Sequence, residues 1–170
     1  MNYFYSNTKR SLVDKGSTGE IPEEVVSRLI HITRSQERFS HDRYAALSGA
    51  YIEEIGEYYA RCSMKITPDH RNAYGAVMGG AIYTLADYAF AAASNHGKEF
   101  VTVSVVGQIS FMSRSKGSVL YADARLIKDG RRNCFYEVSV TDDLGRLIAV
   151  VNINGAQTEI RFDSHTDVRG

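Results

Sequence analysis

Residues 72–97 read NAYGAVMGGAIYTLADYAFAAASNHG, and Asp87 is the only charged side chain among them. From Met78 to Ala93 the remaining residues are Ala, Gly, Ile, Leu, Met, Phe, Tyr and one Thr. A segment that is apolar on every side predicts a buried helix, here from about Gly79 to Asn95. A carboxylate is costly to bury unless it is paired, hydrogen-bonded or neutral. Asp87 therefore either faces water or is retained for chemistry.

Strand-like runs lie on both sides of this helix. Polar and apolar side chains alternate over residues 58–66 before it, and β-type runs follow it at 101–112, 119–127, 133–141 and 147–156. Gly107 is the expected bulge of the first of these, and Asp129-Gly130 predicts a hairpin. One apolar helix needs cover on more than one side. A curved antiparallel sheet wrapped round it supplies that cover, so the sequence predicts an α+β fold.

The N-terminal part of the chain has a different character. Residues 1–20 are polar and expected to be flexible, Pro22 suits the first turn of a helix, and a short helix is expected near 41–47. Val25, Val26, Leu29 and Ile30 share one face of the first helix. The predicted organisation is a flexible N-terminus and helical extension (1–40), a main domain (41–158) and a polar C-terminal tail that frays (159–170).

Composition excludes several classes of function. The 170 residues include 20 basic and 20 acidic side chains, so no basic footprint for nucleic acid is present. Cys62 and Cys134 lie in strand-like runs without metal-ligand spacing, which indicates buried thiols. No signal peptide is recognisable, and a cytoplasmic location is expected. A membrane helix over 73–93 is disfavoured, because Asp87 near its centre would cost about 2.5–3.5 kcal/mol.

Four motifs carry a family resemblance: His70-Arg71-Asn72, Gly75, Met78-Gly79-Gly80 and Leu85-Ala86-Asp87. With the downstream strand and turn VSVVGQISFMSRSKG, they make residues 45–157 resemble the acyl-CoA thioesterases of the phenylacetate-pathway (PaaI-like) type. That family has the hotdog fold, in which a curved antiparallel sheet wraps round a long central helix. The resemblance implies a metal-independent thioester hydrolase that uses no cofactor other than the coenzyme A of its substrate.

The resemblance also implies roles for individual residues. Asp87 would be the catalytic nucleophile or general base, and Gly79 would polarise the carbonyl through its N–H at the helix start. Asn72 and Ser104 would position water or substrate, although a turn residue and an ordinary polar strand residue are equally simple readings. Close packing of the helix against the sheet is an alternative explanation for the Gly79-Gly80 pair. The implied substrate and coenzyme A contacts are Met78, Gly80, Gly130, Arg131 and Arg132, where Arg suits phosphate and a solvated hairpin tip is the alternative.

Met78 departs from the family, which usually has His there. This departure leaves a second hypothesis open, that the protein binds or senses acyl-CoA without catalysis. His70 is not assumed to take the place of the missing family histidine. A hotdog hydratase or dehydratase is disfavoured, because no His lies between Arg71 and Asn95. The resemblance further implies a homodimer or a dimer of dimers, paired along sheet edges, with Asp87 of one chain facing Gly79 of the other.

Overall fold

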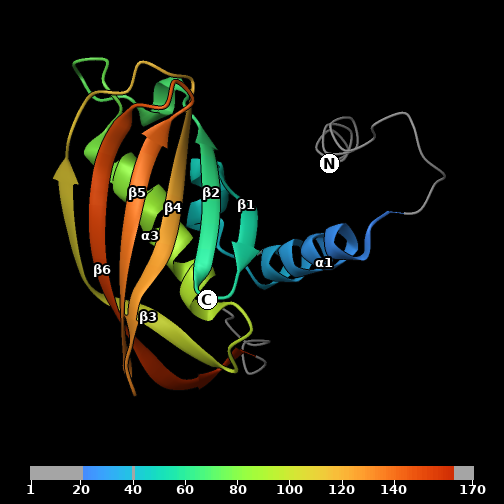
Figure 1. The fold of residues 1–170 in the computed structure, drawn as a ribbon. Helices are drawn as coiled ribbons and strands as arrows, with labels where there is room; N and C mark the ends of the chain where they lie inside the picture. Colours follow the sequence, from blue (N-terminus) through green and yellow to red (C-terminus); the bar gives the residue numbers. More distant parts are fainter. Residues whose placement is uncertain (1–20, 40, 163–170) are drawn as a thin grey trace.

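Six antiparallel strands form a single curved sheet in the computed structural model, which describes residues 21–39 and 41–162. The strand order is β1-β2-β4-β5-β6-β3, so β1 and β3 are the two edges. The sheet wraps round α3 (Figure 1), which confirms the predicted α+β architecture. The elements are α1 (Glu23–Arg38), α2 (Arg43–Ser48), β1 (Ala50–Gly56), β2 (Tyr59–Lys65), the 3-10 turn η1 (Pro68–His70), α3 (Gly79–Asn95), β3 (Phe100–Phe111), β4 (Val119–Asp129), β5 (Asn133–Asp142) and β6 (Leu147–Arg161).

The core lies between α3 and the concave face of the sheet. Small side chains such as Ala86 and Ala89 let the helix approach the strands closely, and Phe90 packs edge-on against Tyr136 with ring centroids 5.3 Å apart. Cys62 and Cys134 are free thiols and both are buried, as predicted. The alternation read from the sequence is therefore the alternation of core-facing and outward-facing side chains.

One face of α3 is not covered by residues 21–39 and 41–162 of the same chain. Gly80 is exposed, and Thr84, Asp87 and Ala91 are part-exposed, at the helical spacing that places residues on one face. The sequence predicted a helix buried on all sides, and for this stripe that prediction is wrong in the monomer. The sheet reaches only part of the way round the helix, so the stripe containing Asp87 stays open.

The N-terminal helices were predicted correctly as elements. The side chain of Asp42 accepts a hydrogen bond from the N–H of Ala45 at 2.9 Å and caps α2, and Gly49 ends that helix with φ 70°. The guanidinium of Arg38 donates to the carbonyl of Asn95 at 2.8 Å, which ties the end of α1 to the end of α3. Residues 1–20 and 163–170, expected to be flexible or frayed, lie outside the described residues, whereas residues 159–161 of the tail expected to fray belong to β6.

Three features of the strands differ from what the sequence predicted. β1 was not singled out, and β6 continues to Arg161 rather than ending at 156, because Arg161 pairs with Phe100. The irregularities of β3 lie between Phe100 and Thr102 and between Ser104 and Val106, whereas Gly107 pairs regularly with Ile153, so the predicted bulge at Gly107 is wrong. A close approach by a side chain of α3, described below, is what requires glycine there.

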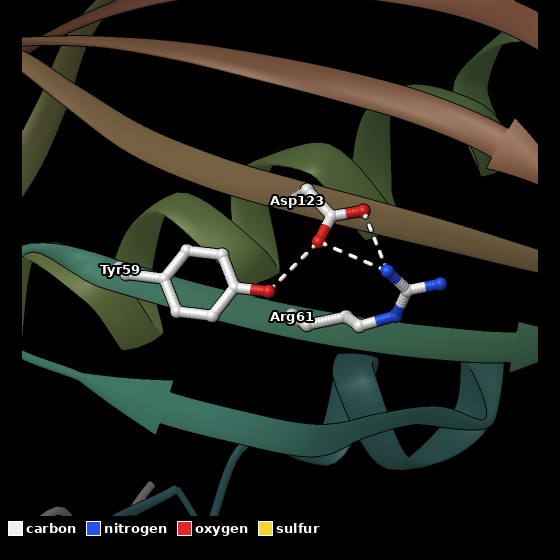
Figure 2. A network of polar contacts seen from close by, with 3 residues as sticks. All are labelled: Tyr59, Arg61 and Asp123. Carbon is white, nitrogen blue, oxygen red and sulfur yellow. Dashed lines mark hydrogen bonds and ion pairs between the residues drawn. The ribbon is translucent and has the colours of Figure 1, made fainter.

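The outer face of the sheet carries a self-contained polar cluster between β2 and β4 (Figure 2). The Tyr59 hydroxyl donates to the Asp123 carboxylate at 2.9 Å, and the Arg61 guanidinium donates to both Asp123 oxygens at 3.2 Å. Arg61 also lies over the Tyr121 ring, and Arg125 lies over the Tyr59 ring. Burial and the bond to Asp123 raise the pKa of Tyr59 to about 12. These groups satisfy one another, and α3 lies on the opposite side of the sheet.

Candidate active site at the central helix

The first turn of α3 presents backbone donors. Met78 precedes the helix without capping it through its side chain, and the N–H groups of Ala81 and Ile82 bond to the Met78 carbonyl. The N–H groups of Gly79 and Gly80 come before these and have no acceptor within their own helix. Gly79 therefore stands at the helix start, where the dipole favours developing negative charge.

Asn72 shapes the loop that leads into this turn. Its side-chain oxygen accepts hydrogen bonds from the N–H groups of Tyr74 and Ala76 at 3.0 and 3.1 Å, while Gly75 takes a positive φ of 73°. The prediction that Asn72 acts as a turn residue is thus confirmed for its side-chain oxygen. The amide NH₂ of the same side chain is the part left to meet a ligand.

His70 anchors the same loop. Its Nδ1 accepts the N–H of Thr67 at 3.0 Å, and its Nε2 lies 3.0 Å from the carbonyl of Ser48. A neutral imidazole with its proton on Nε2 satisfies both bonds, and the His70 carbonyl accepts the N–H of Met78 at 2.7 Å. Both ring nitrogens are engaged in structural bonds, so His70 does not replace the histidine that the family usually has at position 78.

Asp87 lies farther along α3, on its open face. One of its carboxylate oxygens is buried and has no hydrogen-bond partner among the described residues. Burial raises the pKa of Asp87, a hydrogen bond from Ser104 lowers it in part, and the nearby charge of Asp42 raises it. The structure thus brings together two of the predicted residues, Asp87 on α3 and Ser104 on β3.

A single chain does not bring Asp87 to Gly79. The two residues are eight positions apart on one helix, which separates them by about 12 Å along its axis. A thioester carbonyl needs its attacking group and its N–H donor each within about 3 Å. One copy of the chain therefore supplies both parts of the site but does not assemble them on one substrate.

The predicted coenzyme A contacts line a separate cavity. Gly130, Arg131 and Arg132 border a space of about 490 Å³ together with Lys128, Asn133 and Phe135. The hairpin that carries them lies by the C-terminal end of α3, because Lys98 is 3.9 Å from Asp129 just after that helix ends. Gly79 is at the other end of the 17-residue helix, about 24 Å away along its axis.

A second cavity of about 360 Å³ adjoins the start of α3. Its lining includes Gly79, Ile82, Phe111 and Met112, followed by the loop residues 113–115. Met78 is 53% exposed beside it. The sequence reading did not assign a function to Phe111, and only its place at the end of an apolar strand marked it.

Asp142 holds the loop at this end of the sheet. Its carboxylate accepts bonds from the Ser115 hydroxyl and the Lys116 N–H at 3.1 Å, and from the Arg146 N–H at 3.0 Å. Burial acts to raise the pKa of Asp142, but these hydrogen bonds outweigh it and hold the pKa below its usual value. The wall of the second cavity is therefore fixed by a buried carboxylate.

Two further properties of the described residues limit the chemistry available to the site. Nowhere in residues 21–39 and 41–162 do three His, Cys, Asp or Glu side chains gather as a metal site would require. Within those ranges, none of the helices combines the length and the apolar character needed to cross a bilayer. The groups available for chemistry at α3 are therefore a carboxylate, a hydroxyl, an amide and backbone N–H donors.

Known proteins resemble this chain in sequence and fold. The thioesterase superfamily profile matches residues 74–149. An Archaeoglobus fulgidus protein named "Putative esterase" is 35% identical over 114 residues, 66% of this chain and 73% of that protein. The structure of PaaI from the Escherichia coli phenylacetic acid degradation operon superposes with a TM-score of 0.67 at 21% identity, covering 76% of this chain and 98% of that one. PaaI of Thermus thermophilus, solved as a mutant, gives 0.63 at 25% identity, covering 68% and 98%. The chain belongs to the thioesterase superfamily and shares the hotdog fold of the PaaI structures.

Proposed function

We propose that this protein is an acyl-CoA thioesterase whose active site is shared between two copies of the chain. Asp87 of one copy either attacks the thioester carbonyl or removes a proton from the water that does. The C–S bond breaks, the coenzyme A thiol leaves with a proton, and water supplies the oxygen of the free acid. The buried, unpartnered oxygen of Asp87 beside Ser104 is the observation that carries the proposal.

The basicity and the exposure of the Asp87 carboxylate suit a nucleophile or general base. Burial makes a carboxylate more basic, because the charged form loses solvation. The hydrogen bond from Ser104 keeps part of the negative charge stabilised and orients the group. The carboxylate therefore gains basicity while remaining available on the open face of α3.

The donors for the carbonyl oxygen are the N–H groups at the start of α3. Charge grows on that oxygen as the tetrahedral intermediate forms, and a fixed N–H at a helix N-terminus stabilises it there. Loss of one comparable donor costs about 2.7–4 kcal/mol in other hydrolases. Because Asp87 and Gly79 are too far apart in one chain, each site takes its Asp87 from one copy and its Gly79 from the other.

Pairing of two β3 edges provides that arrangement. β3 is an edge strand of 12 residues, and Val103, Val105 and Val106 on it are exposed. An unpaired apolar edge favours addition of another strand, and a two-fold axis would pair β3 with its own copy. Antiparallel pairing places the Phe111 end of one β3 beside the Phe100 end of the other. It also brings the open stripes of the two α3 helices together, in a homodimer or a dimer of dimers.

The same pairing brings one chain's hairpin to the other chain's helix start. The β4–β5 hairpin lies level with the beginning of β3, whereas Gly79 lies level with its end. Lys128, Arg131 and Arg132 then offer positive charge to the phosphates of coenzyme A while the thioester reaches Gly79. Both cysteines are buried thiols, and a cytoplasmic location is part of the proposal.

The second candidate is an acyl-CoA-binding or sensing protein without turnover, and Met78 in place of the family histidine favours it. A panel of acyl-CoAs assayed with a thiol reagent separates the two functions, with Asp87→Asn as the matched control. Thiol release by the native chain and its loss in Asp87→Asn support the thioesterase. Binding without release selects the sensor. A Met78→His variant that gains the first detectable hydrolysis would identify Met78 as the cause.

A further inference from the structure

Two reciprocal glycine–aromatic contacts join α3 and β3. A Cβ built on Gly79 of α3 would lie 2.8 Å from the ring tip of Phe111 on β3. A Cβ built on Gly107 of β3 would overlap the hydroxyl oxygen of Tyr83 on α3 and lie 2.8 Å from its ring. Each element thus supplies one glycine and one aromatic residue, four positions apart, and each ring fills the space that the opposite glycine leaves.

The order of these residues along α3 relates them to the site. Gly79, Tyr83 and Asp87 follow one another at intervals of four, which places them in a row on one side of the helix. Tyr83 therefore stands between the N–H donor at the helix start and the carboxylate, which in the proposed dimer serve two different sites. Burial raises the pKa of the Tyr83 hydroxyl, and the charge of Asp87 raises it further, as expected for neighbours.

The cavity next to Gly79 and the Tyr83–Gly107 contact occupy neighbouring stretches of α3 and β3. On α3 the lining stops at Ile82, one residue before Tyr83, and on β3 it begins at Phe111, four residues after Gly107. Phe111 is 56% exposed and lines this space, whereas Tyr83 is part-buried and packs on the backbone of Gly107. The seam between helix and strand is thus filled in two successive places, by the Phe111 ring at Gly79 and by the Tyr83 ring at Gly107.

We propose that Tyr83 sets the maximum length of the acyl group by closing the α3–β3 seam against Gly107. An acyl chain that passes Phe111 meets the Tyr83 ring, and the bare backbone of Gly107 lets that ring lie flat against β3. The preferred substrates are accordingly short or compact acyl thioesters. This inference rests on the proposed thioesterase function and adds the class of acyl group to it.

Substitutions on both sides of the contact test the proposal. Tyr83→Ala empties the seam, so the ratio of kcat/KM for long over short acyl-CoAs should rise at least about tenfold, the lower end of what one methylene group contributes in an apolar pocket. Tyr83→Phe keeps the ring and should retain the native length profile. Gly107→Ala pushes the Tyr83 ring off β3 and should shift the profile in its own right, away from the bulkiest substrates that the native chain accepts.

Kinetics on saturated acyl-CoAs from acetyl to palmitoyl provide the measurement, and Tyr83→Leu is the substitute if Tyr83→Ala does not fold. A native length profile in a folded, active Tyr83→Ala or Tyr83→Leu protein overturns the inference, as does an equal shift in Tyr83→Phe. If the native chain hydrolyses no acyl-CoA, the proposed function fails instead. The same series is then measured as binding affinities, and Tyr83→Ala must still shift the preference toward longer chains.

Discussion

Ser104 on β3 lies beside Asp87 on α3, and hydrogen bonding from its hydroxyl opposes the effect of burial on the pKa of the carboxylate. The bond stabilises the charged form of Asp87, so its loss must raise the pKa of that group further. Reaction requires the charged carboxylate. The acid limb of the pH–rate profile therefore reports directly on the bond between these two residues.

Ser104→Ala should move that acid limb to higher pH. The shift follows because the remaining influences on Asp87, burial and the charge of Asp42, both raise its pKa. kcat/KM measured against pH for the native and Ser104→Ala proteins checks this. An acid limb that stays in place, or moves to lower pH, would remove Ser104 from the environment of the reacting carboxylate.

Asp87→Asn should lower kcat by orders of magnitude while raising the melting temperature. The part-buried carboxylate is costly when charged, so its removal stabilises the fold by about 1 kcal/mol, or roughly 2–4 °C for a chain of this size. Calorimetry and kinetics on the folded variant measure the two effects.

The stability gain also has a pH dependence with a fixed sign. The folded pKa of Asp87 is raised, so the cost of its charge is complete above that pKa and disappears below the unfolded value of about 3.9. The difference in melting temperature between native and Asp87→Asn protein should shrink as the pH falls toward 4. A gain that persists unchanged in acid would show that the charge is not its cause.

Asn72 allows its two functions to be separated. Asn72→Asp keeps the oxygen that accepts the N–H groups of Tyr74 and Ala76 but loses the NH₂ donor, whereas Asn72→Ala loses both. Asn72→Asp should therefore keep a near-native melting temperature while kcat falls about tenfold or more, the scale of one lost hydrogen bond to substrate or water. Full activity in Asn72→Asp would reduce Asn72 to a turn residue.

Arg131 and Arg132 are tested with two kinds of substrate. The double substitution to Ala should raise KM for acyl-CoA at least about tenfold, because each charge-assisted phosphate contact contributes about 1.5–3 kcal/mol. The N-acetylcysteamine thioester of the same acid lacks those phosphates, and its kinetics should not change. Equal losses on both substrates would mean that the hairpin supports the fold rather than the nucleotide.

The fold was predictable where the local pattern was regular. The apolar run of α3 and the alternation in β2, β4 and β5 each identify their element. β1 was not predicted, because a register shift between Ile52 and Glu54 leaves its buried residues, Ile52 and Ile55, three positions apart and breaks the alternation. Its hairpin also turns through Tyr58, with φ 59°, rather than through the Gly or Asn that marks most such turns.

The site was predictable only in part, because tertiary contacts decide the rest. A glycine in a strand reads equally as a bulge or as a close approach, and only the position of Tyr83 shows that Gly107 is the latter. The donors to Asp142 include the N–H of Lys116, 26 residues away, a partner that no local pattern indicates. Asp87 stood out because a single charge in an apolar run is visible without any structure.

In the proposed dimer, each active site combines Asp87 of one chain with Gly79 of the other. Gly79→Pro removes the N–H donor at the first helical position, where the proline backbone fits but its Cβ displaces the ring tip of Phe111, and Asp87→Asn removes the carboxylate. In a dimer with one chain of each kind, one site carries both defects and the other carries none. Each variant alone should be inactive.

The decisive measurement is the activity of that mixed dimer, purified after co-expression of the two variants with different affinity tags. We expect about half of the native activity per dimer, because one of the two equivalent sites is intact. A mixed dimer as inactive as the two parent variants would contradict it, since a site built within a single chain cannot be restored by a partner.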